Sequence, residues 1–178
     1  PYSASSAYYF PSVARMHAVE VLKGSSQIQY GPYTTGGAIN FVSTVIPESF
    51  KGKVVSSYGS FNTGQLHSTF GNQTRNFGYM LEYLNYNSNG FKSLGNNMNT
   101  GFDINEITSK IRFKSSEKAK NKQSLEFKFH TYDEVSNETY LGLTESDFNN
   151  NPYLRYSASE KDKMNAEHNQ YMLTHEFN

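Results

Sequence analysis

Hydrophobic and polar residues alternate with a period of two over most of the chain after residue 50. The clearest stretch is 124–133, where Leu125 and Phe127 fall on one face and Glu126 and Lys128 on the other. Such alternation is the pattern of a β-strand whose two faces meet different surroundings. The pattern predicts six strands, at 52–60, 64–73, 77–88, 105–115, 122–133 and 167–178.

The lengths of these strands and of their connections favour a membrane. The strands are about 9 to 12 residues long, which is the length of a tilted strand that crosses a bilayer. The connections at 74–76 and 116–121 are short, whereas those at 89–104 and 134–166 are long. Because successive strands run in opposite directions, the short connections lie at one end of the sheet and the long ones at the other, where the tight connection at 61–63 also lies. Outer-membrane barrels have this arrangement of short inner turns and longer outer loops. The pattern alone leaves a soluble β-sandwich with long loops open.

The amino-acid composition excludes several kinds of functional site and partner. The chain has 14 Tyr and 13 Phe, no Cys, and equal numbers of basic and acidic residues, 16 of each. The missing cysteines exclude disulfides, thiolate metal sites and cysteine nucleophiles. A net charge of zero gives no field that attracts nucleic acid, so no nucleic-acid partner is expected. No run of residues approaches the roughly 18 apolar residues of a membrane helix.

The first part of the chain follows a different pattern. Two short strands are expected at 18–22 and 39–45, and four glycines lie between them. Glycine suits left-handed turns and close backbone approach. The segment reads VEVLKG, then YG, then GGAINFVST, and its defining residues are Val19, Glu20, Val21, Lys23, Gly24, Tyr30, Gly31, Gly36, Gly37, Ile39 and Asn40.

This motif resembles the end of the plug domain of TonB-dependent outer-membrane receptors, in order and in spacing. The resemblance continues into YGSFNT at 58–63, where that family ends its first barrel strand. The segments YYFPSVARM and YGPYTTGGAIN, with the loop block at 138–159, look like the ferric dicitrate receptor subfamily. The resemblance covers essentially the whole chain.

The resemblance implies an all-β fold, a transmembrane antiparallel β-barrel of about 22 strands around an N-terminal plug domain. Residues 1–47 would be the C-terminal part of the plug, and 48–178 the first six barrel strands with an outer loop at 134–166. Both ends of the chain lie inside expected elements, so a fragment of a longer receptor is expected.

The implied function is active import of a ferric siderophore, an iron–citrate type of complex, across the outer membrane of a Gram-negative bacterium. The implied partners are the ferric chelate, the TonB–ExbB–ExbD energy-transducing complex and outer-membrane lipid. Iron travels within the cargo, so no cofactor, resident metal or catalytic residue is expected. One alternative keeps the fold and changes the cargo to another siderophore, haem, cobalamin or another metal chelate. The others are a passive porin, a barrel enzyme and a soluble β-sandwich binding module.

Candidate ligand-binding residues follow from the anionic cargo. Arginine binds carboxylates through paired, charge-assisted hydrogen bonds, and Arg155 lies in the long loop with Tyr153 and Tyr156 beside it. Tyr8 and Tyr9 lie where the family has its plug apex. The structural alternatives are an ion pair of Arg155 within the loop (to Glu145, Asp147 or Glu160), packing of Tyr8 and Tyr9 against the barrel wall, and a plug-anchoring role for Lys23.

Overall fold

The computed structural model describes residues 11–24, 31, 36–94, 100–137 and 141–177 of the chain. These form two compact units, 1–45 and 46–178. The first unit holds a 3-10 helix η1 (Val13–Arg15) and an antiparallel pair of strands, β1 (Met16–Leu22) and β2 (Ala38–Ser43). No helix among the described residues is long and apolar enough to cross a membrane.

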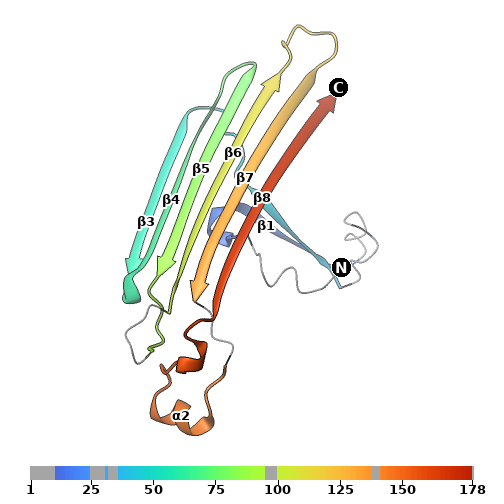
Figure 1. Ribbon diagram of the computed structural model, residues 1–178. Coiled ribbons are helices and arrows are strands. Elements are labelled where there is room, and N and C mark those ends of the chain that lie inside the picture. Colours follow the sequence, from blue (N-terminus) through green and yellow to red (C-terminus); the bar gives the residue numbers. More distant parts are fainter. Residues whose placement is uncertain (1–10, 25–30, 32–35, 95–99, 138–140, 178) are drawn as a thin grey trace. The chain divides into compact units, whose positions relative to one another are not determined.

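The second unit is a single layer of six antiparallel strands in sequence order, β3 to β8 (Figure 1). They are β3 (Lys51–Gly59), β4 (Thr63–Gln73), β5 (Phe77–Ser88), β6 (Phe102–Lys114), β7 (Gln123–Asn137) and β8 (Lys163–Phe177). Short helices lie in the connections: η3 (Ser60–Asn62), α2 (Glu145–Asn150) and η4 (Ser157–Ser159). The all-β class and all six predicted strands are therefore confirmed.

The strands differ from the prediction mainly in length. β7 and β8 have 15 residues each, and both extend further into the long connection than the alternation alone indicates. The extra pairs run from Glu134↔Ala166 to Asn137↔Lys163. The ladder continues here because backbone hydrogen bonds form whatever the side chains are, so strand ends are poorly marked by a hydrophobic pattern.

On β5 to β7 the two faces of the sheet differ in chemistry and in burial, although the covered face also holds the apolar side chains of Met80 and Leu84. Apolar side chains on one face are exposed, for example Ile111 at 39% and Phe127 at 42%. Polar side chains on the other face are buried, for example Glu106 and His130 at 1% each. A water-soluble sheet has the reverse arrangement, with its apolar face against the core.

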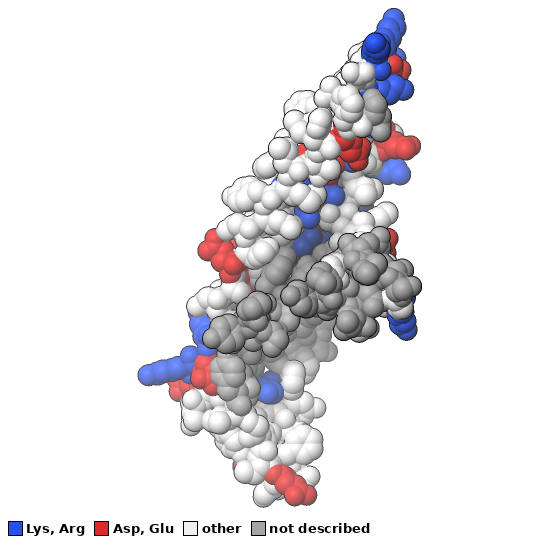
Figure 2. Space-filling model, turned by 90° about the vertical axis from the view of Figure 1, so that its right-hand side faces the viewer, with Lys and Arg blue, Asp and Glu red and all other residues white. Residues whose placement is uncertain are grey.

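Charged side chains of both signs lie toward both ends of the molecule. Figure 2 shows Lys and Arg at the upper tip of the view, where the β6–β7 connection lies, with acidic side chains just below them, and acidic side chains at the lowest tip, where α2 lies. The short connections 74–76 and 115–122 share the first end. The connections that contain η3, α2 and η4 share the second end with residues 89–94 and 100–101.

Candidate functional site

The two halves of the glycine-rich motif lie side by side. Val19 is opposite Phe41, Glu20 opposite Asn40 and Val21 opposite Ile39 in the β1–β2 pair. The Asn40 amide donates to the Glu20 carboxylate at 2.8 Å. VEV and AIN are therefore the two strands of one antiparallel pair, which sequence order alone did not establish.

Backbone conformation explains the glycines of this motif. Gly24, Gly31 and Gly37 have φ of +76°, +119° and +127°, values that residues with a Cβ rarely adopt. At Gly37 an added Cβ would lie 2.9 Å from the carbonyl oxygen of Leu22. Lys23 is exposed at the end of β1. Tyr30, like Tyr8 and Tyr9, lies outside the described residues.

The long connection between β7 and β8 is joined to the connection between β5 and β6. The Ser93 amide donates to the Tyr153 carbonyl at 2.7 Å, and the Arg155 amide donates to the Ser93 carbonyl at 2.9 Å. This makes a short parallel bridge between Ser93 and Leu154. Two loops far apart in sequence are therefore hydrogen-bonded through their backbones.

Three aromatic side chains extend across this end of the sheet. Phe91 meets Phe61 and Tyr153 edge to face, each with a centroid distance of 6.4 Å. All three rings are more than half exposed. Phe61 also has φ of +59°, an uncommon conformation for a bulky residue. Its carbonyl accepts a hydrogen bond from the Asn89 amide at 2.9 Å, which ties this turn to the β5–β6 connection.

Arg155, the predicted cargo-binding cation, is only 2% exposed. One terminal nitrogen donates to the backbone carbonyls of Ser159 and, at 3.3 Å, of Asp162. Hydrogen bonds from a charged donor to carbonyls hold a loop firmly. Its observed position is thus that of a residue which fixes the loop, and contact with cargo stays a prediction.

Tyr156 is also engaged inside the loop, whereas Tyr153 is not enclosed. The Tyr156 hydroxyl donates to Asp147 and accepts from the Thr144 amide at 3.1 Å. The Thr144 side chain caps α2 by accepting from the Asp147 amide at 3.2 Å. The Thr144 hydroxyl also donates to the Asp147 carboxylate at 2.8 Å. The hydrogen bond from the Tyr156 hydroxyl, and after it the one from the Thr144 hydroxyl, lower the pKa of Asp147 from its usual 3.8.

The buried face of the sheet carries a histidine–carboxylate network that the sequence did not single out. His67 Nε2 lies 3.0 Å from Glu82 Oε1, and His130 Nε2 lies 3.8 Å from Glu106 Oε2. The Thr108 hydroxyl lies 3.0 Å from His130 Nδ1. Strand alternation could have placed these side chains on one face, but their partners depend on the register of four strands.

In the described part of the chain, no group of three or more His, Asp or Glu side chains lies close enough together to hold a metal ion. No family model matches the chain, and no solved structure matches it either.

Proposed function

We propose that this chain forms part of a TonB-dependent outer-membrane receptor that imports a ferric chelate of the citrate type. The observation that carries the proposal is the inverted arrangement of β5 to β7, whose exposed face is largely apolar, whereas their other face buries Glu82, Glu106, Thr108 and His130 together with Met80 and Leu84. Lipid on one side and a polar lumen on the other account for that arrangement.

The apolar zone of the exposed face ends before the strands reach the long connections. On β5 it includes Phe77, Tyr79 and Leu81, and it ends where Tyr83 donates to Asn105 Oδ1 at 3.0 Å. Asn85 donates to the same oxygen at 3.0 Å, and the next residues on this face of β5 and β6, Asn87 and Asp103, are polar. An apolar band bounded by tyrosine and then by polar side chains suits the edge of a bilayer.

The zone also crosses the strands obliquely. On β4 the apolar Leu66 is paired with the polar Asn85 of β5, so the zone extends toward the long-loop end there. On β8 it extends the other way, to Phe177 beside Gln123. Tilted strands require such a shift, because a band parallel to the membrane meets each neighbour at a different residue.

The first unit is assigned to the plug because of its motif, and the paired VEV and AIN strands give the motif a structural unit. The cargo is assigned from the resemblance of the long loop, where Tyr153 is exposed and Arg155 orders the backbone beside it. Energy would come from the TonB–ExbB–ExbD complex acting on plug sequence outside this chain.

The test is uptake of radiolabelled iron, offered as citrate, by the host and by a strain in which the gene is deleted. We expect uptake to fall to background on deletion and also when a proton-gradient uncoupler is added. Loss on deletion alone would indicate a passive pore. Unchanged uptake in the deletion strain would remove the citrate cargo, and the same assay with haem, cobalamin and other siderophores would then identify the cargo.

A further inference from the structure

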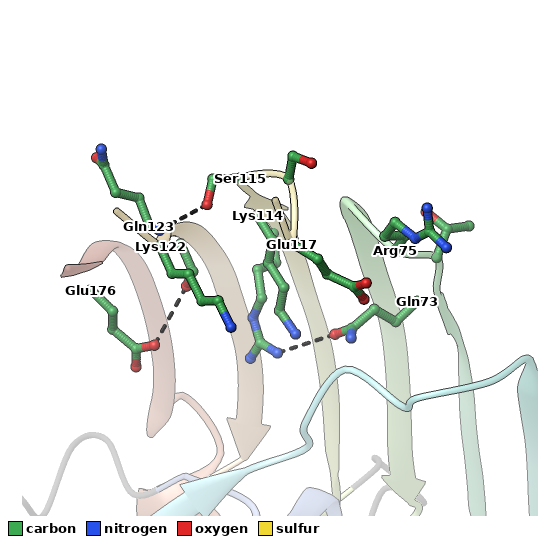
Figure 3. Close-up of a pocket in the computed structure, with 12 residues that line it drawn as sticks. Gln73, Arg75, Lys114, Ser115, Glu117, Lys122, Gln123 and Glu176 are labelled. Atoms are coloured by element: carbon green, nitrogen blue, oxygen red, sulfur yellow. Dashed lines mark hydrogen bonds between the residues drawn. The ribbon is translucent and has the colours of Figure 1, made fainter. Parts of the chain in front are cut away.

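A recess of about 560 Å³ lies where β4 to β8 end at the short connections (Figure 3). Its size is within the range of ligand clefts. In Figure 3, Lys114 and Lys122 extend into it from adjacent strand ends, and Gln73 and Glu117 lie on its other side. The charged residues of its lining are Arg75, Arg112, Lys114, Lys122, Glu117 and Glu176.

Cations outnumber carboxylates in this lining by four to two. Arg112 is already engaged, since its Nε lies 2.8 Å from Glu126 and its Nη1 donates to Gln73 at 3.3 Å. Among the described residues, Arg75, Lys114 and Lys122 take part in no ion pair. Three cations that share one recess without carboxylate partners repel one another, and an anionic ligand removes that repulsion.

The distribution of these cations indicates an extended ligand. Arg75 comes from the β4–β5 connection and Lys122 from the β6–β7 connection, while Glu176 closes the far side on β8. Four strand spacings separate β4 from β8, about 19 Å in all. Five to six residues of extended peptide cover about that distance.

The two carboxylates argue against a compact, densely charged anion. Glu117 and Glu176 line the same recess, and Glu176 accepts from the Ser124 hydroxyl at 3.5 Å. A polyphosphate would bring its charge against both carboxylates. A chain with spaced negative charges can place them beside Lys114, Lys122 and Arg75 while its peptide groups meet serine and glutamine side chains.

We propose that this recess binds an acidic peptide segment in an extended conformation. The inference goes beyond import and does not depend on it, because it rests only on side chains of the second unit. Surface cations steer such partners and contribute modest affinity each.

The probe is a fluorescein-labelled hexapeptide in which aspartate alternates with serine, and its control carries asparagine in place of aspartate. Fluorescence anisotropy would measure binding of both to the intact protein in detergent, with inorganic phosphate as competitor. We expect the acidic peptide to bind, the asparagine peptide not to bind, and phosphate to compete only through ionic strength, as sodium chloride does. Specific displacement by phosphate at low concentration would overturn the peptide assignment in favour of a small-anion site.

A matched pair of variants locates the binding. Lys114→Gln with Lys122→Gln removes two recess cations, and we expect about tenfold weaker binding. Lys118→Gln with Lys120→Gln removes the same charge from the same connection, outside the lining, and we expect less than a twofold change. Equal loss in both variants would show general attraction to a basic end and would overturn the proposal, as would no loss in either. In the Lys114→Gln background, Lys122→Arg keeps the second charge and should bind more tightly than Lys122→Gln. This result would assign the loss of binding to the lost charge and not to misfolding.

Discussion

The two faces of the six-stranded sheet are built from the same strands and differ most, in chemistry and in burial, on β5 to β7. On one face, Phe127 lies between Ile111 and Leu173 and is exposed. On the other, its neighbour in the chain, Lys128, is followed by His130, which is 1% exposed and hydrogen-bonded. The apolar side chains of the first face are exposed, whereas polar side chains of the second face are buried and hydrogen-bonded within the protein. We therefore expect the effect of a substitution on the free energy of unfolding to depend on the face of the sheet on which it lies.

The largest effect is expected from a charge in the middle of the apolar face. Phe127→Lys places an ammonium group among Ile111 and Leu173, and its cost at the centre of a bilayer is about 2–4 kcal/mol. Urea unfolding of the protein in lipid vesicles measures this cost. Asn169→Lys, on the same face beyond the apolar zone, is the control and should cost less than about 1 kcal/mol. Equal, small costs would show that no lipid covers Phe127.

The next effect compares one substitution on both faces. Thr108 is fully buried and its hydroxyl lies 3.0 Å from His130 Nδ1, so Thr108→Val leaves a buried ring nitrogen without that partner. We expect a loss of about 1–3 kcal/mol in the free energy of unfolding. Thr131→Val, on the apolar face of the next strand, should change it by less than about 0.5 kcal/mol. A similar cost at both positions would remove the distinction between the faces.

The long loop extends the comparison to buried polar groups outside the sheet. Arg155→Met removes the donor that holds the carbonyls of Ser159 and Asp162, and the bridge to Ser93 should then open more often. We expect amide hydrogen exchange at Ser93 and Arg155 to become about tenfold faster, since hydrogen bonds to charged groups contribute about 1.5–3 kcal/mol.

Lys161→Met, in the same loop but exposed, is the matched control for Arg155→Met and should leave these exchange rates unchanged. If Arg155→Met leaves exchange unchanged as well, the guanidinium does not order the loop, and its role as a cargo ligand gains support.

The sequence predicted the sheet well because alternation is a local property. The faces of Leu125, Glu126 and Phe127 follow from the period of two. The loop was less predictable. The sequence predicts an ion pair in the loop as one alternative for Arg155, and the structure adds hydrogen bonds to the backbone carbonyls of Ser159 and Asp162, which no side-chain pattern can reveal. The parallel bridge of Ser93 and Leu154 and the recess at the strand ends depend on contacts between residues about 50 or more positions apart.

The smallest effect concerns a polar contact near solvent, at Asp147. Hydrogen bonds from Tyr156 and Thr144 lower the pKa of this carboxyl from 3.8, so the folded loop favours its ionised form. A lowered pKa stabilises the loop fully above pH 3.8, and this stabilisation is lost as the pH falls through the folded-state value.

Tyr156→Phe removes the larger cause of the shift and should bring the pKa of Asp147 back toward 3.8, as measured by ¹³C NMR titration of labelled aspartate. Tyr153→Phe, which removes a hydroxyl from the same loop without touching Asp147, should leave it unchanged. An equal pKa in the Tyr156→Phe variant and the unaltered protein would mean that this hydrogen bond, unlike those of the buried face, is replaced by water without cost.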